Sequence, residues 1–170
     1  MQTPEHNTEH NLAVSMEMEV ENPAADILQT QPEDQTTYSI LEFMPEEVPK
    51  DYVNYIYAKW LRSAKYGNDI YKKIPSEYYY KSYSRYLDSL LHRCKVRLAV
   101  LDDDKDVLLG FACYKDKILH YVYVNREQRR QGIGKSLLPK EIEIYTHYTK
   151  DGIKIVDNKL SDLIFNPFIG

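Results

Sequence analysis

The chain has 170 residues, a formal net charge of −4 and two cysteines, Cys94 and Cys113, so its length corresponds to one domain. That length can bury a core without disulfides or metal ions, and no apolar run approaches the roughly 20 residues of a membrane-spanning helix. Few cysteines, no metal-ligand spacing and no apolar leader segment predict a cytoplasmic protein without a metal site.

The charge divides the chain into an acidic and a basic part. Residues 1–49 hold 11 acidic residues and no lysine or arginine, whereas residues 50–170 hold 15 acidic and 22 basic residues. Residues 1–36 are also poor in large apolar side chains, which predicts a disordered acidic tail before a folded domain over 37–170. The net positive folded part favours an anionic ligand, although its scattered basic residues fit a solvated surface equally well.

The first folded segment, residues 38–43, alternates apolar and polar side chains and predicts a strand. Pro45 and Pro49 then open a helix, whose apolar side chains recur in one stripe at Val53, Ile56, Tyr57, Trp60 and Leu61. Gly67 and Asn68 end that helix, and Pro75 opens a second one. The expected inner face of the second helix consists of Tyr80, Tyr83, Leu87, Leu90 and Leu91.

Three strands follow as a meander, at residues 95–101, 107–114 and 118–124. A helix comes next, and Pro139 limits it to about two turns. Residues 141–148 alternate and predict a fifth strand, Asp151 and Gly152 predict a turn, and residues 163–169 are expected to close a sheet edge. The pattern predicts a mixed α/β protein of the α+β type, with a mostly antiparallel sheet and flanking helices.

The glycine-containing segment from Arg129 to Lys135 lies between a strand and a helix. Free N–H groups at a helix start, together with glycines that let a ligand approach, favour the phosphates of a nucleotide-like cofactor. A triphosphatase loop is excluded because Arg129 stands where that motif needs glycine, and a dinucleotide fingerprint fails at Leu137. The pattern [RQ]-x-x-G-x-[GA] is satisfied by Arg129, Gly132 and Gly134.

Residues 124–134 resemble, without a gap, the acetyl-CoA motif of the GNAT N-acyltransferase superfamily, and the element order over residues 38–148 resembles that family's order. The chain is similar in particular to compact phage-type members, which also end in a segment like Asn166-Pro167-Phe168. The resemblance implies a GNAT-like twisted sheet and an N-acetyltransferase that uses acetyl-CoA as co-substrate. It also implies a primary amine of a protein or small molecule as acceptor. A monomer or homodimer is expected, and the absence of a basic-aromatic ladder and of a long apolar run predicts neither nucleic acid nor a membrane as partner. The alternative is a catalytically degenerate GNAT fold that serves as a CoA-binding or structural module.

The resemblance also implies roles for individual residues. One strand would bind the pantetheine arm through its backbone, and the following loop would hold the pyrophosphate through its N–H groups and positive charge. The cofactor-binding residues expected on this basis are Val122, Tyr123, Val124, Arg129, Arg130, Gln131, Gly132, Ile133, Gly134 and Lys135.

His120 is the first candidate for the general base, because alternation would place it on the strand face that carries Val122 and Val124. His147 is a second candidate for the base or for positioning the acceptor, and Tyr145, on the same expected face, is the candidate acid. A histidine that is only hydrogen-bonded within the sheet is the alternative. The helix that usually carries the acid tyrosine in the family is expected to be absent or reduced in residues 150–162.

Overall fold

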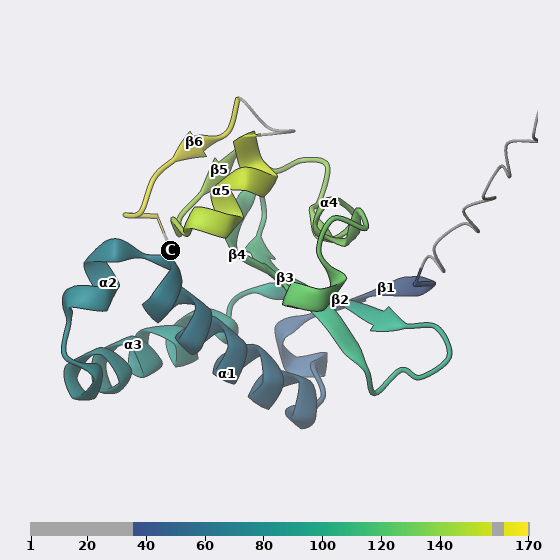
Figure 1. The fold of residues 1–170 in the computed structure, drawn as a ribbon, viewed down its shortest axis with the longest axis horizontal. Helices are drawn as coiled ribbons and strands as arrows, with labels where there is room; N and C mark the ends of the chain where they lie inside the picture. The colour runs from purple at the N-terminus through teal and green to yellow at the C-terminus, as the bar shows by residue number, and fades with distance from the viewer. Residues whose placement is uncertain (1–35, 158–161, 170) are drawn as a thin grey trace, which may run out of the picture. The chain divides into compact units, whose positions relative to one another are not determined.

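The computed structural model describes residues 36–157 and 162–169 (Figure 1). The predicted disordered tail therefore lies outside the described residues except for Thr36, and it stays a prediction. Within the described ranges, no helix combines the length and the apolar character that crossing a membrane would require.

Six strands form one sheet in the order of the sequence. The first four pair antiparallel and are β1 Tyr38–Phe43, β2 Lys95–Leu101, β3 Leu108–Lys115 and β4 Ile118–Val124. The last two add in parallel and are β5 Ile144–Tyr145 and β6 Ile164–Phe165. The predicted mixed, mostly antiparallel sheet is confirmed, and so is the closure of an edge by the segment after residue 162.

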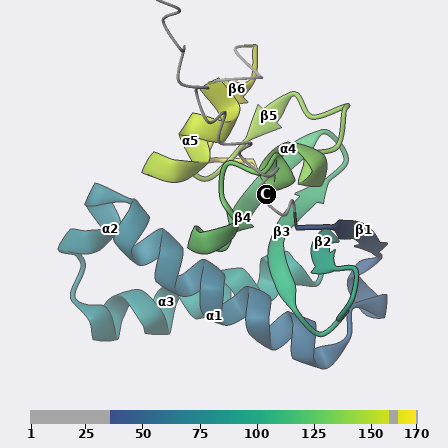
Figure 2. The ribbon, with the colours of Figure 1, turned by 45° about the vertical axis from the view of Figure 1, so that its right-hand side comes forward.

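The helices cover both faces of the sheet, as Figures 1 and 2 show. One face carries α1 Lys50–Gly67, α2 Asp69–Lys73 and α3 Ser76–Leu91. The other carries α4 Ile133–Leu137, which ends two residues before Pro139 as expected. Two short 3-10 helices, η1 Pro45–Glu47 and η2 Arg126–Gln128, and the helix α5 Lys150–Asp157 complete the described elements.

The larger core lies between the sheet and the helices α1 and α3. Trp60 of α1 is fully buried, and its ring stacks on Tyr121 of β4 at a centroid distance of 4.5 Å. On α3 the inner face includes Tyr79, which is 2% exposed, whereas the predicted Tyr80 is 37% exposed. The prediction for Tyr80 was wrong because Tyr79 is the residue one helical turn before Tyr83 on the buried stripe.

The second core lies beneath α4. Ile133 and Leu137 of this short helix are buried against Val122 and Val124 of β4. The two valine side chains are therefore held between β4 and α4, the helix that follows the glycine-containing loop. Packing of this kind holds the end of β4 and the loop in one arrangement.

The segment after α4 differs from the sequence-based prediction. Instead of a strand over 141–148, only Ile144 and Tyr145 pair with β4. The expected turn at Asp151 and Gly152 lies inside α5, so the helix expected to be absent or reduced is present over eight residues. The Thr149 hydroxyl accepts the N–H of Gly152 at 3.0 Å, and this N-cap stabilises a helix where the Asp-Gly pair alone favours a turn.

Gly110 is a position where packing requires the absence of a side chain. An added Cβ would lie 2.5 Å from the Tyr123 carbonyl oxygen in the neighbouring strand and 3.3 Å from Leu137 of α4. We expect Gly110→Ala to lower the free energy of unfolding by about 1–3 kcal/mol, because backbone must move to accept the methyl group. Urea denaturation measures this, with Val107→Ala at an exposed site as a control that should change stability by less than about 0.5 kcal/mol. Equal stability of the two variants would contradict the close approach.

Candidate active site

A β-bulge in β4 determines which way its side chains face. Leu119 lies opposite Tyr114 and Tyr121 opposite Cys113, so His120 is an extra residue without a partner in β3. Leu119 and Val122 therefore lie on the α4 side. His120 does not share the face of Val122 and Val124, contrary to the prediction, because the bulge interrupts the strict alternation of side chains.

The outer edge of β4 loses its strand partner halfway along. Pairing with β5 ends at Leu119 and Tyr145, and no strand in the described ranges pairs with this edge beyond Leu119. The Asn125 N–H donates to the Leu109 carbonyl of β3 at 2.8 Å. Because hydrogen-bonding direction alternates along a strand, the N–H groups of Val122 and Val124 point away from β3, toward the open edge.

The loop after η2 presents unpaired backbone donors. Arg130 and Gly132 have φ values of 69° and 83°, and a Cβ added at Gly132 would meet no atom within 4 Å. The N–H groups of residues 130–134 donate no hydrogen bond to another residue of the described segments. Consecutive free N–H groups in such a turn form a concave site for an anion. The charged ends of Arg130 and Lys135 form no ion pair with a described residue.

Arg129 connects the loop to its surroundings. Its Nε donates to the Val124 carbonyl at 3.2 Å, and its guanidinium forms an ion pair with the Asp151 carboxylate at 2.8 Å. The side chain thus links the end of β4 to the first turn of α5. Its predicted role in cofactor binding stays a prediction, since the structure shows these internal contacts.

A cavity of about 530 Å³ joins the free edge of β4 to this loop. All of the residues predicted to bind the cofactor line it except Gln131. Sequence reasoning missed the opposite wall, which α1, the N-cap of α5 and α5 supply with Ser63, Gly67, Thr149, Asp151, Gly152 and Lys154. The threonine three residues before Gly152 was the available signal, because threonine is a preferred N-cap residue.

The ring of Tyr121 packs on Trp60. Its hydroxyl, however, lies 2.8 Å from the Ser63 hydroxyl and on the wall of the large cavity. Burial raises the pKa of Tyr121 well above its ordinary value, so the phenol keeps its proton at neutral pH.

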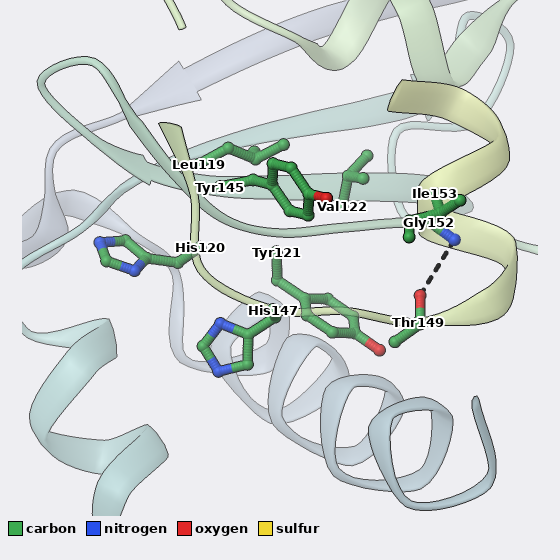
Figure 3. Close-up of a pocket in the computed structure, with 9 residues that line it drawn as sticks. All are labelled: Leu119, His120, Tyr121, Val122, Tyr145, His147, Thr149, Gly152 and Ile153. Atoms are coloured by element: carbon green, nitrogen blue, oxygen red, sulfur yellow. Dashed lines mark hydrogen bonds between the residues drawn. The ribbon is translucent and has the colours of Figure 1, made fainter. Parts of the chain in front are cut away.

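A second cavity of about 20 Å³ lies in the fork between β4 and β5 (Figure 3). This volume is enough for one water molecule. Figure 3 shows Tyr145 beside Leu119 and Val122, and His120 and His147 on the opposite side of β4. Tyr145 and His147 therefore do not share a face as predicted, because the strand ends at Tyr145 and alternation does not continue beyond it.

The two histidines meet at Thr146. The Thr146 hydroxyl lies 3.1 Å from Nδ1 of His120 and 2.8 Å from Nδ1 of His147. His120 is 1% exposed, and His147 packs edge-on against Trp60 at 5.4 Å. Burial lowers the pKa of each histidine to about 4, so both rings are neutral at pH 7 and able to accept a proton.

The lowered pKa values of His120 and His147 predict that the free energy of unfolding decreases at acidic pH. Each ring has a pKa near 4 in the folded state and 6.5 in the unfolded chain, so the unfolded state binds more protons between those values. We expect full stability above pH 6.5 and a loss as the pH falls toward 4, of up to about 3 kcal/mol for one histidine. Urea denaturation at several pH values measures it. In His120→Gln the free energy of unfolding should change less with pH. Replacement of the exposed His92 with glutamine should not have this effect. A slope that His120→Gln leaves unchanged would contradict this account.

The chain is similar to one protein family and to several solved structures. Residues 56–158 match the model of the acetyltransferase (GNAT) family. The apo form of YjaB from Escherichia coli is similar at 21% identity and a TM-score of 0.42, over 59% of this chain and 61% of that one. The chain thus spans about three fifths of that protein's length.

Two further solved structures are similar over larger shares. A candidate acetyl transferase from Pyrococcus furiosus has 17% identity and a TM-score of 0.49, over 78% of this chain and 84% of that one. A ribosomal-protein-alanine N-acetyltransferase from Brucella melitensis biovar Abortus has 15% identity and a TM-score of 0.33, over 76% and 80%. A comparison with curated proteins found no match. The resemblance to phage-type members is not addressed by these comparisons and stays a prediction.

Proposed function

The chain belongs to the acetyltransferase (GNAT) family, and from this premise we propose that it transfers the acetyl group of acetyl-CoA to a primary amine by direct attack. The observation that most supports this is the continuous cavity of about 530 Å³ between the free edge of β4 and the 129–135 loop. A long cofactor with a diphosphate near its middle and a thioester at its end needs a strand edge along one part and anion-binding amides along another.

The residues of the loop fit a diphosphate. Five consecutive N–H groups, from Arg130 to Gly134, donate to no described residue, and the space beside Gly132 is open. Arg130 and Lys135 add positive charge around these donors without being neutralised by a described carboxylate. Several N–H groups and two cations together favour an anion of more than one charge.

Acetyl-CoA, when bound, supplies the activated acetyl group as a thioester. The N–H and carbonyl of Val122 and the N–H of Val124 would bind its pantetheine arm as an additional strand, because they point toward the open edge. The Val122 N–H would also donate to the thioester oxygen, which gains negative charge during the transfer. One such donor is commonly worth about 3 kcal/mol.

The acceptor amine must lose a proton. A lysine-type amine has a pKa of about 10.4, so deprotonation at pH 7 costs about 4.6 kcal/mol. We assign the base to the histidine pair His120 and His147, whose neutral rings line the fork cavity beside Val122. Tyr145, which lines the same cavity, is the proposed acid for the departing thiolate, and the Tyr121 hydroxyl on the wall of both cavities is a second candidate. The described α5 carries no tyrosine for this role.

Cofactor binding is the first test. We expect isothermal titration to give a micromolar Kd for acetyl-CoA, and Gly134→Glu to abolish binding because a carboxylate would then occupy the anion site. Ile70→Glu, which adds the same charge at a site 71% exposed in α2, should bind as the unmodified protein does. No binding at millimolar acetyl-CoA would end the proposal.

Transfer is the second test. Labelled acetyl-CoA incubated with lysine peptides, a polyamine and an aminoglycoside should give an acetylated amine that mass spectrometry identifies. With that acceptor, His147→Gln should lower turnover about 100-fold, the size of a general-base contribution, and leave the Kd for acetyl-CoA unchanged. His92→Gln serves as the matched control. Tight binding without transfer to any amine would instead favour the cofactor-binding module.

A further inference from the structure

The Thr146 side chain lies between the two histidines, and the acetyl transfer proposed above gives it no role. Thr146 follows β5 and is 4% exposed. Its hydroxyl lies within hydrogen-bond distance of Nδ1 on both rings, at 3.1 Å from His120 and 2.8 Å from His147. The Thr146 N–H donates to the Leu119 carbonyl at 3.0 Å, so the backbone fixes this side chain where the two strands part.

The number of protons available limits how the three groups can bond. A hydroxyl has one proton and donates one hydrogen bond, although its oxygen can accept two. Thr146 therefore cannot donate to both histidines, and at least one ring must carry its own proton on Nδ1. A neutral ring with a proton on Nδ1 keeps the lone pair of Nε2 free to accept another.

Accessibility and surroundings distinguish the two rings. His120 is 1% exposed and faces Arg93 and Lys115, whose positive charges oppose its protonation. His147 is half-buried; burial and the nearby His120 ring oppose protonation of its ring, whereas a hydrogen bond with the His120 backbone favours it. Its other neighbours are the rings of α1, α3 and β4, namely Trp60, Tyr83, Tyr86 and Tyr121. None of these neighbours is a carboxylate, so a proton taken by His147 is not trapped by an ion pair.

We propose that Thr146 is a positioning residue: its hydroxyl accepts the Nδ1–H of His147 and donates to Nδ1 of His120, which leaves Nε2 of His147 free to take the proton of the attacking amine. This inference rests on the proposed acetyl transfer. The amine nitrogen uses its lone pair to bond the acetyl carbon, and the carbon–sulfur bond breaks with its electron pair on sulfur. The proton that the nitrogen loses goes to Nε2 of His147. Tyr145, the proposed acid, gives its phenolic proton to the thiolate and regains one through solvent as the His147 imidazolium releases its own, so the products are an amide and a free thiol.

The tautomers of the histidine rings give a test that needs no acceptor. Long-range proton–nitrogen correlation spectra of the ¹⁵N-labelled full chain at pH 7.5 distinguish a proton on Nδ1 from one on Nε2, with His120→Gln and His147→Gln variants for assignment. We expect His147 to carry its proton on Nδ1. Thr146→Val, which replaces the hydroxyl with a methyl group of similar size, should shift the ring toward the Nε2–H form, and Thr146→Ser should restore the original tautomer.

The kinetic measurement is made on the same variants with the acceptor that the transfer screen identifies. We expect Thr146→Val to lower kcat at least tenfold and to leave the Kd for acetyl-CoA within twofold, with Thr146→Ser within threefold of the unmodified enzyme. A full kcat for Thr146→Val would overturn the proposal.

The spectra separate failure of this inference from failure of the proposed function. An Nε2–H tautomer of His147 in the unmodified protein would overturn the role of Thr146, and that measurement decides even if Thr146→Val does not fold. Absence of acetyl transfer by the unmodified protein would refute the enzyme function itself, because the amine would then have no reaction for His147 to assist.

Discussion

The separation of β4 from β5 after Leu119 is the constraint on which the candidate site depends. A strand edge that continues without a partner leaves N–H and carbonyl groups that need hydrogen bonds, and burying one unpaired costs about 1–3 kcal/mol. The N–H and carbonyl of Val122 and the N–H of Val124 face a cavity of about 530 Å³ instead of another strand, whereas the Val124 carbonyl accepts from Arg129. An extended ligand with its own amides can satisfy them, which is why the fork is the natural place for a pantetheine arm.

Short elements with strong local contacts keep the fork open. β5 has two residues, and the chain then turns into α5, whose Gly152 N–H is capped by the Thr149 hydroxyl. A longer β5 would have continued along β4 and filled the gap. The Arg129–Asp151 ion pair joins the loop to α5, but exposed pairs contribute at most about 1 kcal/mol. Capping and sheet pairing therefore determine the shape of the fork more than this charge pair does.

The bulge at His120 also brings titratable side chains together at the fork. By turning one side chain of β4 to the side of α1 and α3, it brings His120 to the hydroxyl of Thr146 and thereby to His147. Burial holds both rings neutral. Each neutral ring beside the strand edge has a lone pair that can take the proton an attacking amine must give up.

The sequence alone determined the features that depend on neighbouring residues. Periodicity gave the first four strands and the two long helices, and the glycine-containing loop was recognisable because anion binding there uses the backbone of consecutive residues, Arg129 to Lys135. Only the tertiary structure decided which side chains meet. His120 and Thr146 are 26 residues apart, and the bulge that brings them together arises from the register of β3 against β4. Alternation along one strand cannot reveal a register shift, because the extra residue exists only relative to the partner strand.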